Sequence, residues 1–189
     1  MLILISGCSG SGKNTIIQEL LKRYNNIKFL KSCTTRKKRP NENKDAYIYI
    51  SKEEFDQKLK NDEIMEHEEI HQNFYGLLKS SINEVIEFDK KDQHYVKDVG
   101  VLGQINLVRA LKNKVNVLSI YLKVPRKELI RRLTLRGERD IDLRLSRMEF
   151  EMGYINNFDV IINNIDIEKT TTRIEKLIKK FKTKTIGGK

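Results

Sequence analysis

The chain has 189 residues, 39% of them hydrophobic, which suits one domain whose core buries roughly 70% of the unfolded surface. No apolar run is long enough to span a bilayer, so the sequence predicts a cytoplasmic protein without a membrane partner. Its formal charge of +11 indicates an anionic partner. Nucleic acid is disfavoured, because the aromatic residues do not interleave with a basic stripe as base-stacking platforms do.

A glycine-rich run, GCSGSGKNT at residues 7–15, lies between an apolar segment at 2–5 and apolar residues at helical spacing over 16–21. Glycines let backbone N–H groups turn toward an anion, and a helix N-terminus adds partial positive charge. The order strand, loop, helix therefore predicts a phosphate cradle from which Lys13 reaches the terminal phosphates of a nucleotide. Asn14 stands where the P-loop pattern has Ser or Thr. Asn14 and Thr15 both offer an oxygen to Mg²⁺, and the sequence leaves open which one touches it.

The rest of the chain alternates expected strands with expected helices. Ser51 and Ser81 each open a capping-box pattern with a Glu three residues later, and Pro125 is expected to open another helix. Further helical spacing of apolar residues occurs over 102–111 and 174–181. Strands are expected at 27–30, 47–50, 64–70, 95–99, 115–124 and 158–162. This alternation predicts an α/β fold with a doubly wound parallel sheet.

Charged side chains gather at three further points. Arg36 and Arg39 lie three residues apart in a cationic turn, where two guanidinium groups can clamp a phosphomonoester, although plain surface charge is an equal alternative. Asp98 lies at the carboxyl end of an expected strand, where it would hold the water shell of Mg²⁺ or cap the next helix. Arg136 and Arg144 belong to an arginine-rich section that fits a closing flap, or in part a basic helix surface.

Together these residues resemble the guanylate kinase family, and the similarity runs from the phosphate loop to Asn163. Its most specific part is the run TTRKKRP at residues 34–40, followed by Tyr47, Glu66 and Tyr75-Gly76. The resemblance implies a P-loop nucleoside monophosphate kinase fold of three layers, with a central parallel sheet. It also implies a core at 1–31, 93–135 and 148–185, a small mixed α/β NMP-binding subregion at 32–92 and a short lid at 136–147.

The resemblance further implies phosphoryl transfer from ATP to GMP, and to dGMP, with Mg²⁺ and without a covalent intermediate. The implied catalytic residues are Lys13, Arg136 and Arg144, and Asn14 and Asp98 would serve the metal, Asp98 through water. The implied ATP-binding residues are Gly7, Ser9, Gly10, Ser11, Gly12, Lys13, Asn14, Thr15 and Asn163. The implied GMP-binding residues are Ser32, Arg36, Arg39, Tyr47, Glu66, Tyr75 and Gly76.

In this scheme Ser32 and Glu66 read guanine, whose N1–H and N2–H₂ donors suit a carboxylate and whose O6 suits a hydroxyl. The chain departs from the family where small hydroxyl residues are replaced by Leu77 and Leu78. It departs again where a second Asp and a Gln are replaced by Gly100 and Leu102. Two alternatives stay open, a weakly catalytic binding module of the same fold and a kinase for another nucleoside monophosphate. The oligomeric state is open as well.

Overall fold

A five-stranded parallel sheet forms the centre of the computed structural model, which describes residues 1–38, 46–70, 72–89 and 93–186. Its strands stand in the order β2-β7-β1-β8-β9, and each neighbouring pair is parallel. The strands are β1 (Leu2–Ser6), β2 (Ile27–Phe29), β7 (His94–Asp98), β8 (Val117–Lys123) and β9 (Val160–Asn163). The predicted doubly wound sheet is therefore confirmed.

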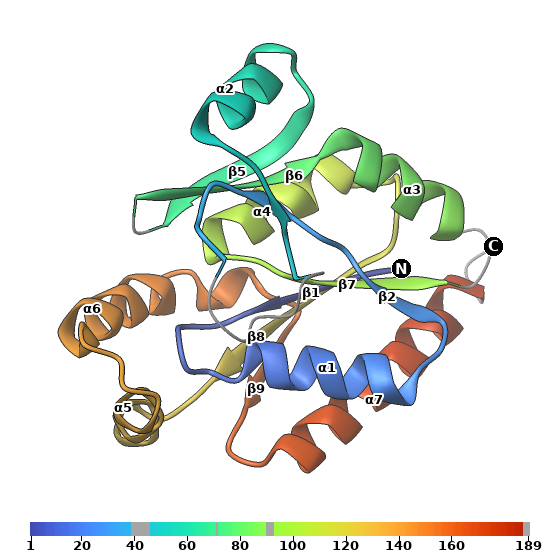
Figure 1. The fold of residues 1–189 in the computed structure, drawn as a ribbon. Coiled ribbons are helices and arrows are strands. Elements are labelled where there is room, and N and C mark those ends of the chain that lie inside the picture. Colours follow the sequence, from blue (N-terminus) through green and yellow to red (C-terminus); the bar gives the residue numbers. More distant parts are fainter. Residues whose placement is uncertain (39–45, 71, 90–92, 187–189) are drawn as a thin grey trace.

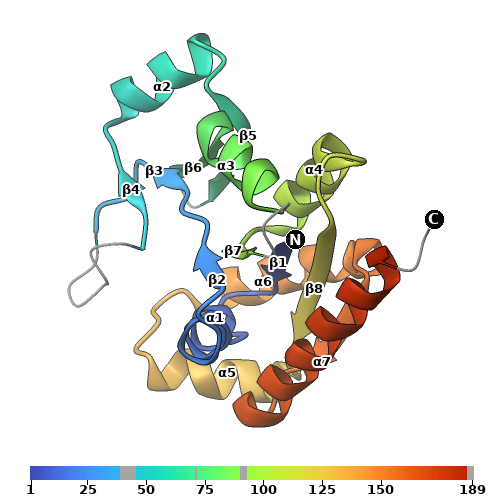
Figure 2. The ribbon, with the colours of Figure 1, turned by 90° about the vertical axis from the view of Figure 1, so that its right-hand side faces the viewer.

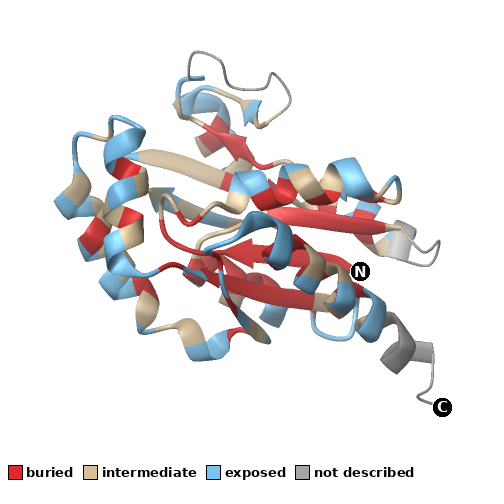
Figure 3. Cartoon of the chain, turned by 90° about the horizontal axis from the view of Figure 1, so that it is seen from below, coloured by how far each residue is buried: buried red, intermediate tan, exposed pale blue. Residues whose placement is uncertain are grey.

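Helices cover both faces of this sheet and make the three layers (Figure 1). α1 (Lys13–Arg23) and α7 (Ile167–Ile186) pack on one face, while α3 (Lys79–Asp89) and α4 (Val101–Leu111) pack on the other. β1 is buried at every residue, and Figure 3 shows long buried stretches in the strands of this sheet. Successive side chains of a strand point to opposite faces. Ile3 and Ile5 therefore join the core under α1 and α7, and Leu2 and Leu4 join the core under α3 and α4.

Two helices lie beyond the carboxyl ends of the strands. α5 (Arg126–Leu135) and α6 (Ile141–Met152) are followed by a 3₁₀ helix at Ile155–Asn157. Pro125 precedes α5 as its N-cap residue, one position before the first helical residue. Cys8 of the glycine-rich run packs with Val124 and with apolar side chains of both helices, so these helices are joined to the loop by a small core.

A second, four-stranded sheet stands in the order β4-β3-β6-β5. Its strands are β3 (Cys33–Thr34), β4 (Ile48–Tyr49), β5 (Ile64–Ile70) and β6 (Asn73–Leu78), and α2 (Lys52–Lys60) packs on it through Phe55. Figure 2 shows this sheet and α2 at the opposite end of the molecule from α1, α5 and α7. The capping box predicted at Ser51 is confirmed, because its hydroxyl accepts from the Glu54 N–H and the Glu54 side chain accepts from the Ser51 N–H.

Some local predictions are wrong. α3 begins at Lys79, so Ser81 lies inside the helix and does not cap it, and Glu84 instead accepts a 2.6 Å hydrogen bond from the Tyr95 hydroxyl. The strand expected at 47–50 is reduced to two residues. The pairing of β6 with both β3 and β5 was not predicted, since it depends on partners distant in sequence.

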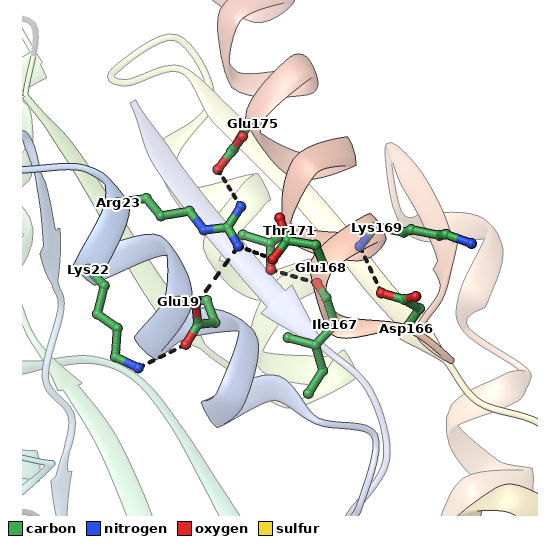
Figure 4. A network of polar contacts seen from close by, with 9 residues as sticks. All are labelled: Glu19, Lys22, Arg23, Asp166, Ile167, Glu168, Lys169, Thr171 and Glu175. Carbon is green, nitrogen blue, oxygen red and sulfur yellow. Dashed lines mark hydrogen bonds and ion pairs between the residues drawn. The ribbon is translucent and has the colours of Figure 1, made fainter.

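A polar network ties α1 to the first turns of α7 (Figure 4). The Arg23 guanidinium lies between the carboxylates of Glu168, Glu175 and Glu19. These contacts are at the surface, where ion pairs contribute about 0–1 kcal/mol each, so the buried core beneath holds the two helices together. Within the described part of the chain, no helix has the length and apolar character needed to cross a membrane.

Candidate active site

The glycine-rich run forms a loop between β1 and α1, as predicted. Gly7, Gly10 and Gly12 have positive φ angles of 145°, 83° and 92°, a backbone conformation that side chains disfavour. A Cβ on Gly12 would also lie 2.6 Å from the Asn164 amide nitrogen. The loop is thus close to neighbouring segments, and only glycine fits its path.

Two side chains of this loop point in different directions. The Lys13 ammonium donates to the carbonyl oxygens of Gly7 and Cys8, so it lies over the loop at the N-terminus of α1. The Cys8 side chain is turned into the core below, and this burial raises the pKa of its thiol to about 11, although the charge of Lys13 opposes the shift. The thiol is therefore uncharged at neutral pH, and Lys13 supplies the positive charge of the loop.

A first cavity, called the donor cavity here, opens over the loop. Lys13, Asn14, Thr15 and Arg136 all line it, as expected for residues that hold a nucleoside triphosphate. Its lining residues are Ser9, Gly10, Gly12, Lys13, Asn14, Thr15, Tyr47, Asp98, Arg132, Arg136, Asn164 and Ile167.

Asn164, not the predicted Asn163, belongs to this cavity. Asn163 is the exposed last residue of β9 and does not line it, because successive strand residues face opposite sides. The buried Asn164 side-chain amide donates a 2.7 Å hydrogen bond to the Ser11 carbonyl, and the backbone carbonyl of Asn164 accepts from Arg132. Asn164 and Arg132 therefore brace the loop, and sequence reasoning missed both roles.

A second cavity, called the acceptor cavity here, lies between the two sheets and α6. It brings together the predicted Ser32, Tyr47, Glu66, Tyr75 and Arg144. Its lining residues are Gly7, Ser9, Lys13, Ser32, Tyr47, Glu66, Glu68, Ile70, Tyr75, Lys97, Asp98, Val99, Gly100, Arg144, Arg147 and Glu151. Of the other predicted residues, Gly76 and Arg36 do not appear in this lining. Arg39 lies outside the described residues, and Gly76 is buried in β6, where a Cβ would meet Phe55 and Cys33.

Arg36 lies near tyrosines of the acceptor cavity. Its guanidinium lies 5.5 Å from the centre of the Tyr47 ring and 6.0 Å from that of Tyr49. The Tyr47 ring in turn packs edge-on against Tyr75, with ring centres 5.8 Å apart. A guanidinium and two phenol groups thus gather on one side of the cavity, a set suited to an anionic phosphate.

Tyr47 also reaches across to the central sheet. Its hydroxyl donates a 3.1 Å hydrogen bond to Asp98 at the end of β7, and burial together with the Asp98 charge raises the pKa of this phenol. Asp98 does not cap the next helix, because the N-cap residue of α4 is Gly100 and no side chain caps it. The helix-cap interpretation of Asp98 is therefore wrong, and its role in holding the water shell of Mg²⁺ stays a prediction.

Glu66 carries an unusual charge environment. Burial raises the pKa of its carboxyl from 4.5 to about 7, with a smaller contribution from Glu68, while the nearby Lys97 ammonium opposes the shift. Lys97 itself is buried on β7 and donates a hydrogen bond to the Ser32 hydroxyl. A carboxyl, an ammonium and a hydroxyl therefore lie together in the acceptor cavity.

Side chains of α6 close another side of the acceptor cavity. Arg147 forms an ion pair with Glu68 of β5 and a second one, of 3.3 Å, with the buried Glu151. Arg144 pairs with Glu138 at 3.3 Å. The sequence indicated an arginine-rich flap with Arg136 and Arg144, but the roles of Arg147 and Glu68 as a bridge from α6 to the second sheet were missed.

The oxygen donors near Lys13 fit a magnesium ion that arrives with a nucleotide. Asn14 and Thr15 line the donor cavity, and Asp98 lines both cavities. Mg²⁺ in such sites keeps several waters and takes one or two protein oxygens besides phosphate oxygens. No group of three or more His, Cys, Asp or Glu side chains able to hold a metal occurs among the residues that the structure describes. The donor set therefore suits a nucleotide-bound metal better than a metal held by protein alone.

The two cavities meet. They share four lining residues, Ser9, Lys13, Tyr47 and Asp98. A phosphate-bearing ligand in one cavity would therefore face a ligand in the other across the Lys13 ammonium.

A protein-family model described as guanylate kinase matches residues 1–181. The chain belongs to the guanylate kinase family.

Individual members of the guanylate kinase family are similar along nearly the whole chain. A guanylate kinase of Bacteroides thetaiotaomicron is 35% identical over 189 residues, with 97% of this chain and 90% of that protein covered. One of Prochlorococcus marinus subsp. pastoris is 38% identical over 184 residues, with 94% and 96% covered. The crystal structure of guanylate kinase from Anaplasma phagocytophilum superposes with a TM-score of 0.74 at 27% identity, covering 95% of this chain and 84% of that one.

The departures from the guanylate kinase pattern have structural explanations. Leu77 is buried in the core under α3 and α4, and Leu78 packs with the small core beside α2. Leu102 is partly exposed on α4 and lines neither cavity. A Cβ on Gly100 would overlap the Glu68 carboxylate, so in this chain Glu68 occupies the space beside that position.

Proposed function

We propose that this protein transfers the γ-phosphoryl group of ATP to GMP, and to dGMP, by direct phosphoryl transfer. The observation that carries the proposal is the meeting of the donor and acceptor cavities at Lys13 and Asp98. A reaction between two bound phosphates needs both substrates at one point, with positive charge beside the transferred group. The family relationship supports the same reaction.

The donor side uses the loop. Its backbone N–H groups and the N-terminus of α1 face the ATP phosphates, and Lys13 neutralises charge on them. Asn14 or Thr15, with Asp98 through water, would hold Mg²⁺, which supplies charge neutralisation of the phosphates. Arg136 at the end of α5 lines the same cavity and would stabilise the transferring group.

The acceptor side uses residues of the second sheet. Tyr47, Tyr75 and Arg36, with Arg39, would hold the GMP phosphate, and Arg144 enters from α6. Ser32 and Glu66 would read guanine. An ionised Glu66 accepts from N1–H and N2–H₂, whereas adenine would leave a buried carboxylate without those donors.

The proposed division of the chain follows from this. Residues 32–92 contain the second sheet and would form the NMP-binding subregion, and 136–147, between α5 and α6, would form the lid. The core would comprise 1–31, 93–135 and 148–185. Both cysteines are free thiols, which fits the reducing conditions of the cytoplasm, where we propose that the protein acts.

The test is GDP formation from MgATP and GMP, run beside AMP, CMP, UMP and dTMP. Lys13→Ala should lower kcat by about 100-fold or more, because the removed charge acts on the transferring phosphoryl group. Lys22→Ala is the matched control, since Lys22 is an exposed lysine on the same helix that pairs with Glu19. Equal turnover in Lys13→Ala and Lys22→Ala would refute the proposal, and a preference for another monophosphate would change the acceptor.

A further inference from the structure

Lys97 is a buried lysine in the acceptor cavity. It lies on β7, between β2 and β1 of the central sheet, and is 2% exposed, yet it lines the cavity. A buried ammonium is costly unless partners compensate it. Ser32 accepts one of its hydrogen bonds. Burial lowers the pKa of the Lys97 ammonium, and the charges of Asp98 and Glu66 oppose this shift. An ammonium has three donors, so Lys97 can donate to a ligand while it keeps Ser32.

Among the cationic groups that line this cavity, Lys97 is the one whose charge acts on the Glu66 carboxyl. Leu77 and Leu78 of β6 pack into hydrophobic cores and offer no hydrogen bond. The Ser32 hydroxyl accepts from Lys97 and lies beside it. A ligand carbonyl placed next to Glu66 therefore meets Lys97 and Ser32 as donors.

The order of these groups matches one base edge. A 6-oxopurine such as guanine presents an acceptor, O6, directly beside its N1–H donor, and guanine adds N2–H₂. An ammonium beside a carboxylate complements this sequence of groups. Adenine reverses both positions, with an amino group at C6 and an unprotonated N1, so it would bring donor against donor and acceptor against acceptor.

We propose that Lys97 is a specificity-determining residue that donates a hydrogen bond to the O6 atom of the acceptor base, with Ser32 beside it and Glu66 on N1–H. This deepens the proposed function, because it assumes that the acceptor cavity binds GMP. Lys97 could otherwise serve only to position Ser32 and balance the Glu66 charge. With such a structural role, loss of Lys97 would weaken the binding of every guanine-like ligand equally. With a hydrogen bond to O6, it would weaken most the binding of ligands that carry O6.

The test compares GMP with 6-thio-GMP, which keeps N1–H and N2–H₂ and replaces O6 by sulfur, a weaker acceptor. Binding is measured by calorimetry without ATP, for the wild type, Lys97→Met and Lys28→Met. Lys28→Met is the matched control, since Lys28 is exposed on β2, the strand paired with β7. Lys97→Met should fold, because replacing a buried charge by an apolar side chain of similar length is often neutral or stabilising.

Wild type and Lys28→Met should prefer GMP by about 10-fold or more, the range of one hydrogen bond from a charged donor. In Lys97→Met this preference should fall to about twofold or less. Lys97→Gln, which keeps a donor, should restore part of it. An unchanged preference in Lys97→Met, with both ligands weakened equally, would overturn the proposal.

The outcomes also separate this proposal from the proposed reaction. Selective GMP binding that depends on Lys97, without GDP formation in the presence of MgATP, would support the role of Lys97 and refute the kinase reaction. GDP formation by the wild type, together with an unchanged preference between GMP and 6-thio-GMP in Lys97→Met, would support the kinase reaction and refute the role of Lys97. Absence of GMP binding to the wild type would overturn both.

Discussion

Replacing Glu66 by Gln should change how the stability of the free protein depends on pH. The native pKa of this carboxyl is raised from 4.5 to about 7 by burial, so the folded protein favours its neutral form. The stabilisation from that protonated form is fully present below pH 4.5 and is lost as pH rises through about 7. Each pKa unit corresponds to about 1.4 kcal/mol, so the loss approaches about 3 kcal/mol.

Urea unfolding at pH 5 and pH 8 measures the effect. The unfolding free energy of the wild type should decline by about 2–3 kcal/mol more than that of Glu66→Gln over this interval, because Gln has no proton to lose. The other titrating groups are the same in both proteins, so contributions that do not depend on the Glu66 charge cancel in the difference. Parallel pH profiles for the two proteins would show that Glu66 titrates normally and would refute the reasoning.

Two further predictions concern a glycine of the phosphate loop and a carboxylate near Glu66. Gly12→Ala should lower the unfolding free energy by about 2–5 kcal/mol, since a left-handed backbone costs about 1–2 and the displaced Asn164 about 1–3. Gly137→Ala, with φ 71° and no atom within 4 Å of its Cβ, should show only the backbone cost in the same urea unfolding measurement. Glu68→Gln should lower the pKa of Glu66, because the Glu68 charge contributes to its upward shift. The midpoint of GMP affinity against pH should then move to lower pH, as the ionised carboxylate accepts from guanine.

Each of these predictions has a contradicting result. Equal destabilisation by Gly12→Ala and Gly137→Ala would mean that the contact with Asn164 has no energetic weight. If the midpoint of GMP affinity against pH stays unchanged in Glu68→Gln, the charge of Glu68 does not affect the pKa of Glu66. The titration of the GMP phosphate is common to the proteins compared and does not affect that comparison.

Local patterns predicted the central sheet and the phosphate loop well. The glycines of the loop are required by its backbone angles, and such requirements are visible in residue type alone. β5 spans Ile64–Ile70 as expected, and it carries Glu66 into the acceptor cavity. These features depend on short segments, and the residue types within each segment are enough to predict them.

The missed features depend on tertiary contacts. Asn163 and Asn164 are adjacent, and only the end of β9 decides which of them faces the loop. Lys97 stands in an expected strand, but its partners Ser32 and Glu66 come from segments distant in sequence. The same holds for Glu68 and Arg147, which are 79 positions apart. Pairings of this kind have no signal in a single sequence.

The burial of the two thiols has a practical consequence for chemical labelling. The Cys8 side chain is turned from the phosphate loop into the core, and burial raises the pKa of its thiol to about 11. Cys33 is fully buried in the second sheet, and its pKa is also raised by burial. Thiol reagents attack the exposed thiolate, so neither cysteine should react in the closed native state. The rate of labelling at each cysteine then measures how often its own part of the molecule opens. The protein thus carries two built-in probes of local unfolding, one beneath each half of its active site.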